Sequence, residues 1–236
     1  MNLHDFKDHQ QEGILYIVST PIGNLEDITI RALKVLRKVD MIACEDTRKS
    51  LRLLNHFKIK KPLTSFFSGN QSYKGTKIIK LLKEGKNIAL VSEAGTPGIS
   101  DPGTSLIAEA IRNDIKIFPI GGVSAAIIAL SNSGFDTSKF CFIGFLPRKK
   151  GKKKKILLNF KDRDETLILF ESPHRIIELL QDLLALFGNR EITLCREMTK
   201  LHEQTIHSSL EDILKSTDSI NFRGEITLVV RGNNQP

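Results

Sequence analysis

Four short turns in this sequence carry side chains whose types and spacing could do chemistry. Each turn follows an apolar run, and proline, glycine and acidic residues concentrate in the first three. In open α/β sheets, ligands bind outside the carboxyl ends of the strands, so we expect these turns to form a binding site. The turns are "TPIGNLED" (20–27), "CEDTR" (44–48), "SEAGTPGISDPG" (92–103) and "GGVSA" (121–125).

The turn over residues 92–103 has the wrong charge for a phosphate site. It contains Glu93 and Asp101 and no basic residue, so it would repel the anion that a helix N-terminus attracts. The GxGxxG and GxxxxGK[ST] patterns are also missing from the sequence. Two carboxylates beside exposed amides instead suit hydroxyls, an amine or a cation, and S-adenosylmethionine (SAM) has all three. The alternative is that both carboxylates only cap a turn and a helix.

The segments around these turns alternate between strand and helix. "ILYIVST" (14–20) is typical of a buried strand, and "ITIRALKVLRKV" (28–39) has apolar residues near a 3.6-residue period. The alternation continues to residue 120, which predicts βαβ units and a largely parallel sheet. Because 236 residues suit two domains, the break at "PIGG" predicts a first domain over 13–121 and a second over 122–236.

The second domain is also predicted to be α/β, with a more mixed sheet. A helix is predicted over 172–188, with Ser172 as its cap, Pro173 at its first position and Gly188 at its end. The predicted strands are "FCFIGF" (140–145), "TLILF" (166–170), "EITLC" (191–195) and "EITLVV" (225–230).

The net charge of +8 comes from one segment. "RKKGKKKK" (148–155) holds seven of the 35 basic residues, and the remaining 28 nearly balance the 27 acidic residues. Such a run is typical of a polyanion contact, because each lysine placed on a phosphate releases counterions. A solvated loop is the alternative.

Composition argues against several other classes. Cys44, Cys141 and Cys195 are far apart, so neither a disulfide framework nor a zinc knuckle is indicated. "HEQTIH" (202–207) spaces its histidines by five positions where a zincin requires four, and we expect no metal. No apolar run approaches the roughly 20 residues of a membrane span, and residues 1–12 are expected to form a loose tail without the blocks of a secretory signal.

Six motifs together resemble one known family, the ribosomal RNA small subunit methyltransferase I group of the tetrapyrrole methylase superfamily. They run in order from about Gly13 to Gly232: "LYIVSTPIGNLEDITIRAL", "ACEDTR", "LVSEAGTPGISDPG", "FIGFLPRKKG", "FESPHR" and "REMTKLHE". The resemblance implies two α/β domains of the tetrapyrrole methylase type, with SAM in the cleft between them, and a cytoplasmic homodimer. It also implies methyl transfer to the ribose 2′-oxygen of a cytidine in 16S rRNA of the small ribosomal subunit, with no membrane or DNA partner.

The resemblance further implies which residues bind the cofactor. In the first domain they are Pro21, Ile22, Gly23, Glu93, Gly95, Thr96 and Ile99. At the junction they are Ser124 and Ala125, and in the second domain they are Phe170, Glu171, Met198 and Glu225.

The sequence departs from the family pattern at three places. The family usually has Asp where Glu93 stands, and the extra methylene moves the charge by about 1.5 Å. The junction has Gly122 and Val123 where the family is proline-rich. The segment "SFFSGNQ" (65–71) replaces a loop that tends to contain His and Glu, which leaves the role of this loop open.

Methyl transfer to a ribose hydroxyl needs an aligned oxygen and a nearby base or cation. Our catalytic candidates are Glu45 and Asp46, as base or for ribose positioning, with Arg48 to orient them. A structural ion pair is the alternative for Asp46 and Arg48. His174 and Arg175 form a second candidate group, which could equally be plain helix caps.

The basic run is the candidate RNA contact. No aromatic residue lies within it, so we expect it to contact phosphates rather than to stack on bases. Two other functions remain open: methylation of a tetrapyrrole carbon, whose acidic macrocycle does not call for a lysine run, and RNA binding without catalysis, which leaves the four turns unused. The predicted RNA-binding residues are Arg148, Lys149, Lys150, Lys152, Lys153, Lys154 and Lys155.

Overall fold

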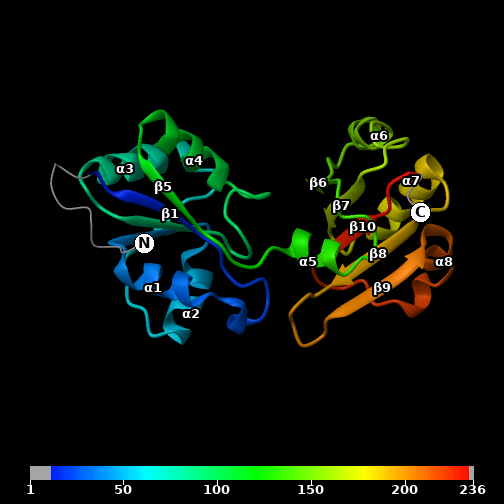
Figure 1. The fold of residues 1–236 in the computed structure, drawn as a ribbon, viewed down its shortest axis with the longest axis horizontal. Helices are drawn as coiled ribbons and strands as arrows, with labels where there is room; N and C mark the ends of the chain where they lie inside the picture. The colour runs from blue at the N-terminus through cyan, green and yellow to red at the C-terminus, as the bar shows by residue number, and fades with distance from the viewer. Residues whose placement is uncertain (1–11, 234–236) are drawn as a thin grey trace. The chain divides into compact units, whose positions relative to one another are not determined.

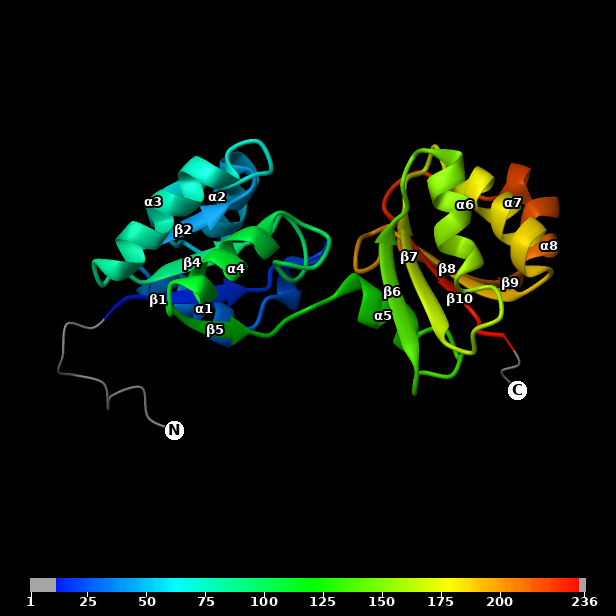
Figure 2. The ribbon, with the colours of Figure 1, turned by 90° about the horizontal axis from the view of Figure 1, so that it is seen from above.

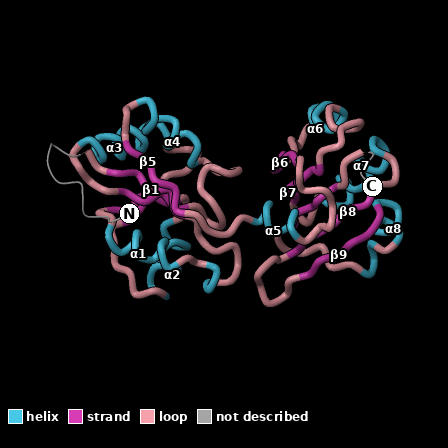
Figure 3. The backbone as a smooth tube through the Cα atoms, in the orientation of Figure 1, coloured by secondary structure: helices cyan, strands magenta, loops and turns pink. Residues whose placement is uncertain are grey.

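The computed structural model describes residues 12–233, which form two compact units, and the chain passes from the first to the second between Val123 and Ser124 (Figure 1). Of the predicted tail, only Glu12 lies within the described residues. Helices and strands alternate through most of the first unit, and strands follow one another more closely in the second (Figure 3). Within residues 12–233, every helix is too short or too polar to span a lipid bilayer.

The first unit contains a five-stranded sheet in the order β3-β2-β4-β1-β5. Each pairing in it is parallel, which confirms the predicted parallel sheet. The strands are β1 (Ile14–Val18), β2 (Met41–Cys44), β3 (Leu63–Ser65), β4 (Ile88–Val91) and β5 (Lys116–Ile120). The helices are α1 (Ile30–Lys38), α2 (Thr47–His56), α3 (Gln71–Lys83) and α4 (Gly103–Arg112), with a 3-10 turn η1 (Leu25–Asp27) before α1.

Alternate residues of each strand pack on opposite faces of this sheet. Leu15 and Ile17 belong to the core under α3 and α4, whereas Val18 belongs to the core under α1 and α2. Figure 1 shows the two helix pairs on the two sides of the sheet. The neighbouring strands β1 and β4 are followed by helices on opposite faces, α1 and α4. Their carboxyl ends therefore form a topological switch point, where open α/β sheets bind ligands.

The second unit contains a five-stranded sheet in the order β6-β7-β10-β8-β9. The pair β6–β7 is parallel and the other three are antiparallel, so the predicted mixed sheet is confirmed. The strands are β6 (Phe140–Phe145), β7 (Thr166–Glu171), β8 (Glu191–Arg196), β9 (Gln204–Ser209) and β10 (Ile226–Val230). The helices are α5 (Ala125–Ser131), α6 (Lys150–Leu158), α7 (Ile176–Phe187) and α8 (Leu210–Lys215), followed by a 3-10 turn η2 (Thr217–Ser219).

The two faces of this second sheet are covered differently. Helix α7 supplies Leu179 and Leu183 to a core that includes Leu169 of β7 and Leu228 of β10. The short helix α5 packs against β7, β8 and β10 from the other side (Figure 2). Its alanines allow close approach: Ala129 is fully buried.

Helix α7 begins later than predicted. Its first residue is Ile176, and its N-cap is Arg175 rather than Ser172. The Ser172 carbonyl accepts from the amides of Arg175 and Ile176, and the Ser172 amide donates to Glu171, so a separate turn precedes the helix. The predicted first helical position of Pro173 is wrong because this turn is bonded to Glu171. The predicted end at Gly188 is confirmed.

Helix α8 and three further elements were not predicted from the sequence. Strand β3 has only three residues, and β9 is largely polar, with the sequence "QTIHSS". The third is the lysine run, which forms helix α6 instead of a loop. Its apolar residues, such as Leu157, are outnumbered by lysines, so no periodicity is visible in the sequence.

Helix α6 is joined to α7 by a buried lysine. The Lys153 side chain is 4% exposed, with its Nζ 2.5 Å from Asp182 Oδ2 and 3.2 Å from Glu178 Oε1. Burial alone would lower the pKa of Lys153, but the hydrogen bonds to Asp182 and Glu178 together with their negative charges raise it. Lys153 therefore faces α7, while Lys152, Lys154 and Lys155 are exposed.

We predict that Lys153→Gln weakens the α6–α7 contact, because it leaves two partly buried carboxylates without their main cation. The expected loss is about 1–3 kcal/mol in the free energy of opening, measured by hydrogen exchange of α6 and α7 amides. Lys154→Gln removes the same charge from an exposed site and should change this value by less than about 0.5 kcal/mol. Equal effects of the two substitutions would contradict the structural role of Lys153.

Candidate functional site

The turns that follow β1 and β4 are joined by a pair of backbone hydrogen bonds. The Thr20 amide donates to the Gly95 carbonyl at 2.9 Å, and the Gly95 amide donates to the Thr20 carbonyl at 3.0 Å. Gly95 has a φ of +80°, a conformation that glycine adopts without steric cost. The bridge holds two of the four predicted turns together at the switch point.

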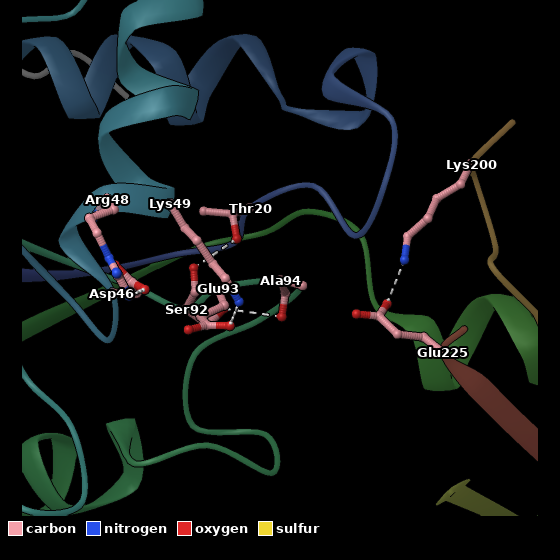
Figure 4. A network of polar contacts seen from close by, with 9 residues as sticks. All are labelled: Thr20, Asp46, Arg48, Lys49, Ser92, Glu93, Ala94, Lys200 and Glu225. Atoms are coloured by element: carbon pink, nitrogen blue, oxygen red, sulfur yellow. Dashed lines mark hydrogen bonds and ion pairs between the residues drawn. The ribbon is translucent and has the colours of Figure 1, made fainter. Parts of the chain in front are cut away.

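Side-chain hydroxyls extend this link. Thr20 Oγ1 donates to the Ser92 carbonyl at 3.2 Å (Figure 4). Ser92 Oγ donates to the Gly95 carbonyl at 2.9 Å. Ser19 Oγ lies 3.0 Å from Thr96 Oγ1, and Thr96 Oγ1 donates to the Val123 carbonyl at 3.5 Å. The turn after β5 is thereby tied to the same place.

The structure brings most of the predicted cofactor residues of the first unit together. Pro21 and Ile22 are buried directly after the bridge, and Ile22 Cγ2 lies 3.5 Å from where a Cβ on Gly95 would be. Gly23 is exposed, as is Ile99, whose side chain is 49% exposed at the other end of the β4 turn. None of these residues is charged, so this part of the candidate site consists of backbone groups and apolar side chains.

Asp101 fills the capping role that was the alternative for it. Its Oδ1 accepts from the Gly98 amide at 2.8 Å and from the Gly103 amide at 2.7 Å. One carboxylate oxygen therefore closes the turn after β4 and binds the first amide of α4. Asp101 is a structural residue of this turn.

Glu93 is paired with a lysine that sequence reasoning missed. Lys49, in the first turn of α2, binds Glu93 Oε2 through its Nζ (Figure 4). The pair links the turn after β2 to the turn after β4, because these strands are neighbours. The signal was present in the sequence, since Lys49 follows "CEDTR" directly, but only sheet order places it beside Glu93.

Asp46 and Arg48 form a compact unit of their own. Asp46 caps α2 by accepting from the Arg48 amide at 2.8 Å, and its Oδ2 lies 2.8 Å from an Arg48 guanidinium nitrogen. These hydrogen bonds from Arg48 hold the pKa of the Asp46 carboxyl well below its usual range. The arrangement matches the structural ion pair that was the alternative for these two residues.

Glu45 differs from its neighbour. Burial raises the pKa of its carboxyl, and the charges of Glu93 and Asp101 raise it further, while Lys49 acts in the opposite direction. Glu45 directly follows β2, at the same sheet edge as the bridge. A half-buried carboxyl with a raised pKa among other acids is typical of a proton-transfer group.

In the second unit, the predicted cofactor residues gather at one sheet edge. Strand β10 is antiparallel to β7 and β8, and Ile226 pairs with Glu171 on one side and Arg196 on the other. The end of β7, the segment after β8 and the start of β10 therefore adjoin. Phe170, Glu171, Met198 and Glu225 all lie there, whereas Ser124 caps α5 and Ala125 begins it.

Glu171 has one oxygen that is poorly satisfied. The residue is 2% exposed, and its Oε1 accepts from the Ser172 amide at 2.7 Å. Oε2 lies 3.2 Å from the Arg175 guanidinium but receives no hydrogen bond from the described residues. Arg175 instead donates to the Leu146 carbonyl at 3.1 Å, and His174 is exposed. A buried carboxylate oxygen without a donor is suited to a ligand's hydroxyl or amine.

Met198 is held by a clamp around it. Glu197 Oε1 accepts from Lys200 Nζ at 2.8 Å and from the Glu225 amide at 2.9 Å, and Lys200 Nζ also lies 3.0 Å from Glu225 Oε2. Glu197 and Thr199, on either side of Met198, have positive φ angles of 51° and 65°. Non-glycine residues adopt this conformation only when their surroundings enforce it.

The clamp requires a glycine opposite it. Gly224 has a φ of +105°, and a Cβ there would lie 2.5 Å from Glu197 Cγ. The charged pairing of Glu197 with Lys200 lowers the pKa of Glu197. Met198 and Glu225 are thus fixed relative to each other by contacts that the motif "REMTK" alone does not reveal.

No metal centre is apparent in the part of the chain that the structure describes: no group of three or more His, Cys, Asp or Glu residues there could hold an ion. His207 is on β9, with its Nδ1 3.0 Å from Thr193 Oγ1. Of the remaining predicted RNA contacts, Arg148, Lys149 and Lys150 are exposed. Burial of Lys153 does not fit the RNA contact predicted for it.

Comparison with known proteins identifies the class. Residues 14–214 match the family described as tetrapyrrole (corrin/porphyrin) methylases. A solved uroporphyrin-III C-methyl transferase from Thermus thermophilus, complexed with S-adenyl homocysteine, has a TM-score of 0.65 at 15% identity, covering 93% of this chain and 97% of that one. This second match shows the fold.

Closer relatives define the group. A protein from Thermotoga maritima is 47% identical over 220 residues, which are 93% of this chain and 99% of that protein. One from Halalkalibacterium halodurans is 45% identical over 230 residues, which are 98% of this chain and 80% of that protein. Both are named ribosomal RNA small subunit methyltransferase I. The chain therefore belongs to the tetrapyrrole methylase family, in the ribosomal RNA small subunit methyltransferase I group, and it is a methyltransferase.

We predict that Glu45→Gln stabilises the first unit near neutral pH. Because the folded-state pKa of Glu45 is raised, the folded state favours the protonated carboxyl, and that advantage is lost as the pH rises through this pKa. Glutamine resembles the protonated form at every pH. Urea unfolding should show a gain for the variant near pH 7 that vanishes below the ordinary pKa of 4.5. Glu26→Gln, at an exposed position in η1, is the control; destabilisation by Glu45→Gln at neutral pH would contradict the prediction.

Proposed function

We propose that this chain transfers the methyl group of SAM to the ribose 2′-oxygen of a cytidine in 16S rRNA of the small ribosomal subunit. The observation that supports this most directly is the high identity to proteins named for small-subunit rRNA methylation, over nearly the whole chain. The two edge clusters described above supply residues of the types that this chemistry needs.

We assign the cofactor to the predicted residues at the two clusters. Two features of this chain fit SAM: the turn at Gly95, which presents backbone, and the buried Glu171 Oε2, which lacks a donor. A ribose hydroxyl or an amine would satisfy that oxygen. When bound, SAM supplies a methyl group that its sulfonium activates for in-line displacement by oxygen. In the first unit, the proposed SAM contacts are Pro21, Ile22, Gly23, Gly95, Thr96 and Ile99. Glu93 is a further proposed contact, and its ion pair with Lys49 positions its side chain.

Ser124 and Ala125 remain proposed contacts at the junction, and Phe170, Met198 and Glu225 in the second unit. The ring of Phe170 packs edge-on against Phe142, with centroids 5.0 Å apart, so it is a rigid apolar surface. Glu225 is fixed through Lys200 and Glu197, as described above. This set has no role for His174, which is exposed.

Glu45 is the residue we propose to accept the proton of the 2′-hydroxyl. Its raised pKa brings its basicity closer to that of a useful general base than an ordinary carboxylate's. Asp46 and Arg48 satisfy each other, and we assign them to fixing the first turn of α2 behind Glu45. Lys49 lies where its charge would favour a negatively charged oxygen.

The exposed basic residues of α6 and of the two positions before it are the proposed phosphate contact. Arg148, Lys149, Lys150, Lys152, Lys154 and Lys155 are all exposed, and we leave Lys153 out because it is buried against α7. Within the described residues, no carboxylate forms an ion pair with Lys152, Lys154 or Lys155. We further propose a homodimer that works in the cytoplasm, where its rRNA substrate is found; the family resemblance supports the dimer.

Methylation with labelled SAM tests the proposed function. The purified chain should label small subunits that lack the mark, at a ribose of 16S rRNA, and should not label uroporphyrinogen. Glu45→Gln should lower kcat by roughly 10²- to 10⁴-fold with little change in SAM binding, because only proton transfer is lost. Label on the macrocycle and none on RNA would replace rRNA with a tetrapyrrole as the substrate. Failure to bind SAM by calorimetry would leave only an RNA-binding role.

The salt dependence of RNA binding tests the α6 surface. Replacing Lys152, Lys154 and Lys155 with Gln should weaken binding and reduce the slope of log K against log salt by about 2 to 3, because each lost phosphate contact removes close to one counterion. The control is the triple substitution of Lys34, Lys58 and Lys60 with Gln, which removes the same charge from the first unit. It should leave the slope unchanged. An unchanged slope for the α6 variant would exclude α6 from the interface.

A further inference from the structure

A groove runs along the first turns of α3, at the edge of the first unit. It has a volume of about 810 Å³ and includes Asn70, Tyr73, Lys77 and Lys80 among its lining residues. We propose that this groove holds a single-stranded segment of RNA beside the target nucleotide. The inference rests on the proposed function for its substrate, but on different residues from those assigned above.

The charge of the groove suits a polyanion. No acidic residue lines it, and α3 itself contains four lysines and no acidic residue. Lys77 is exposed and forms no ion pair with the described residues, while Lys80 is 3.9 Å from Glu84 Oε1. Hydroxyl and amide side chains make up most of the remaining lining, and these groups donate hydrogen bonds to phosphate and sugar oxygens.

Exposed aromatic rings distinguish this groove from the surface of α6. Tyr73, which lines the groove, is 73% exposed, and Phe67, next to the lining residue Ser68, is 42% exposed. Unpaired bases stack on such rings, whereas the bases of a duplex are already stacked on one another. Lysines with exposed aromatics therefore favour single-stranded RNA over a duplex or a free phosphate.

The mouth of the groove is pre-ordered. Asn70 Oδ1 accepts from the Phe67 amide at 2.9 Å, and Asn70 Nδ2 donates to the Ser65 carbonyl at 3.2 Å. These bonds fix the "SFFSGNQ" loop without any ligand, so binding would cost little ordering. The loop has its own fixed shape in this chain.

The position of the loop connects it to the proposed reaction. It follows β3, whose neighbour β2 ends at Cys44, directly before Glu45. The Phe66 amide donates to the Cys44 carbonyl at 2.8 Å, so the loop and the Glu45 turn leave the same edge side by side. An RNA strand bound in the groove would therefore lie next to Glu45, the carboxylate that we assign as the base.

Matched pairs of variants test the groove in the full-length chain, with a fluorescein-labelled single-stranded RNA of the target sequence as the probe. Tyr73→Ala should weaken binding by roughly tenfold through the loss of stacking, and Tyr73→Phe should bind like the unmodified chain. Lys77→Gln should reduce the salt slope by about 0.7, the value for one phosphate contact on a single strand, and Lys83→Gln, on the same helix outside the groove, should leave it unchanged. The Kd for SAM, measured by calorimetry, should be unchanged in all four variants.

The outcomes separate this inference from the proposed function. Loss of RNA affinity in Tyr73→Ala and Lys77→Gln, but not in their partners, supports the groove even if no RNA is methylated, in which case the proposed function alone falls. Methylation of small subunits by the unmodified chain, with equal single-strand affinity in all four variants, would overturn the groove. Equal losses in Lys77→Gln and Lys83→Gln would also overturn it, because they would reflect net charge only. Since Tyr73 and both lysines are exposed, folding should survive each change.

Discussion

The backbone bridge between Thr20 and Gly95 is the contact on which the first half of the site depends. It joins the turns that leave two parallel strands whose helices lie on opposite faces of the sheet. Without it these turns would diverge, because the helices that follow them, α1 and α4, pack on opposite faces of the sheet. The hydroxyls of Thr20 and Ser92 reinforce the bridge by donating to backbone carbonyls, and the Ser19 hydroxyl pairs with that of Thr96. The result is a surface of ordered backbone groups. It resembles a phosphate-binding loop in this respect, but the side chains around it are acidic rather than basic.

Charge is distributed around that surface in two ways. Asp46 and Asp101 are capping residues, and their carboxylates hold the first turns of α2 and α4 in place. Glu45 lies near the charges of Glu93 and Asp101, which disfavour its ionised form. The charge of Lys49 offsets part of this repulsion. Strained or destabilised groups of this kind accumulate where function needs them.

The second unit positions its predicted cofactor residues by a different arrangement of strands. Its edge cluster relies on antiparallel pairing, which brings the start of β10 between the ends of β7 and β8. Glu197 and Lys200 then fix Met198 and Glu225, and Gly224 leaves the space that Glu197 occupies. Two basic surfaces of different kinds complete the molecule: α6 has lysines without aromatics, and α3 has lysines beside exposed rings. Such surfaces suit phosphate contacts and base stacking respectively.

Local patterns in the sequence determined a large part of this description. The alternation of apolar runs with helical periodicity was enough for the parallel first sheet, and the glycine- and proline-rich turns were recognisable because each follows a strand. Short or polar elements such as β3 and β9 left no such pattern, since pairing to a neighbour, rather than side-chain periodicity, keeps them in place. The start of α7 was misplaced because a carboxylate one residue before Ser172 bonds its amide, a contact that propensity does not include.

What only the tertiary structure decided is which charged group faces which. By itself the sequence showed that Glu45, Asp46, Glu93, Asp101 and a lysine run were present, and it narrowed the chemistry to a cationic, hydroxyl-bearing ligand and a polyanion. Sheet order then placed Lys49 on Glu93, helix packing buried Lys153 against Asp182, and strand register set Glu171 beside the start of β10. These partners are 29 to 55 residues apart in the sequence, and the free energy of a charge depends on its nearest neighbours in space. Residue types therefore follow from the sequence, but their protonation, pairing and availability follow from the fold.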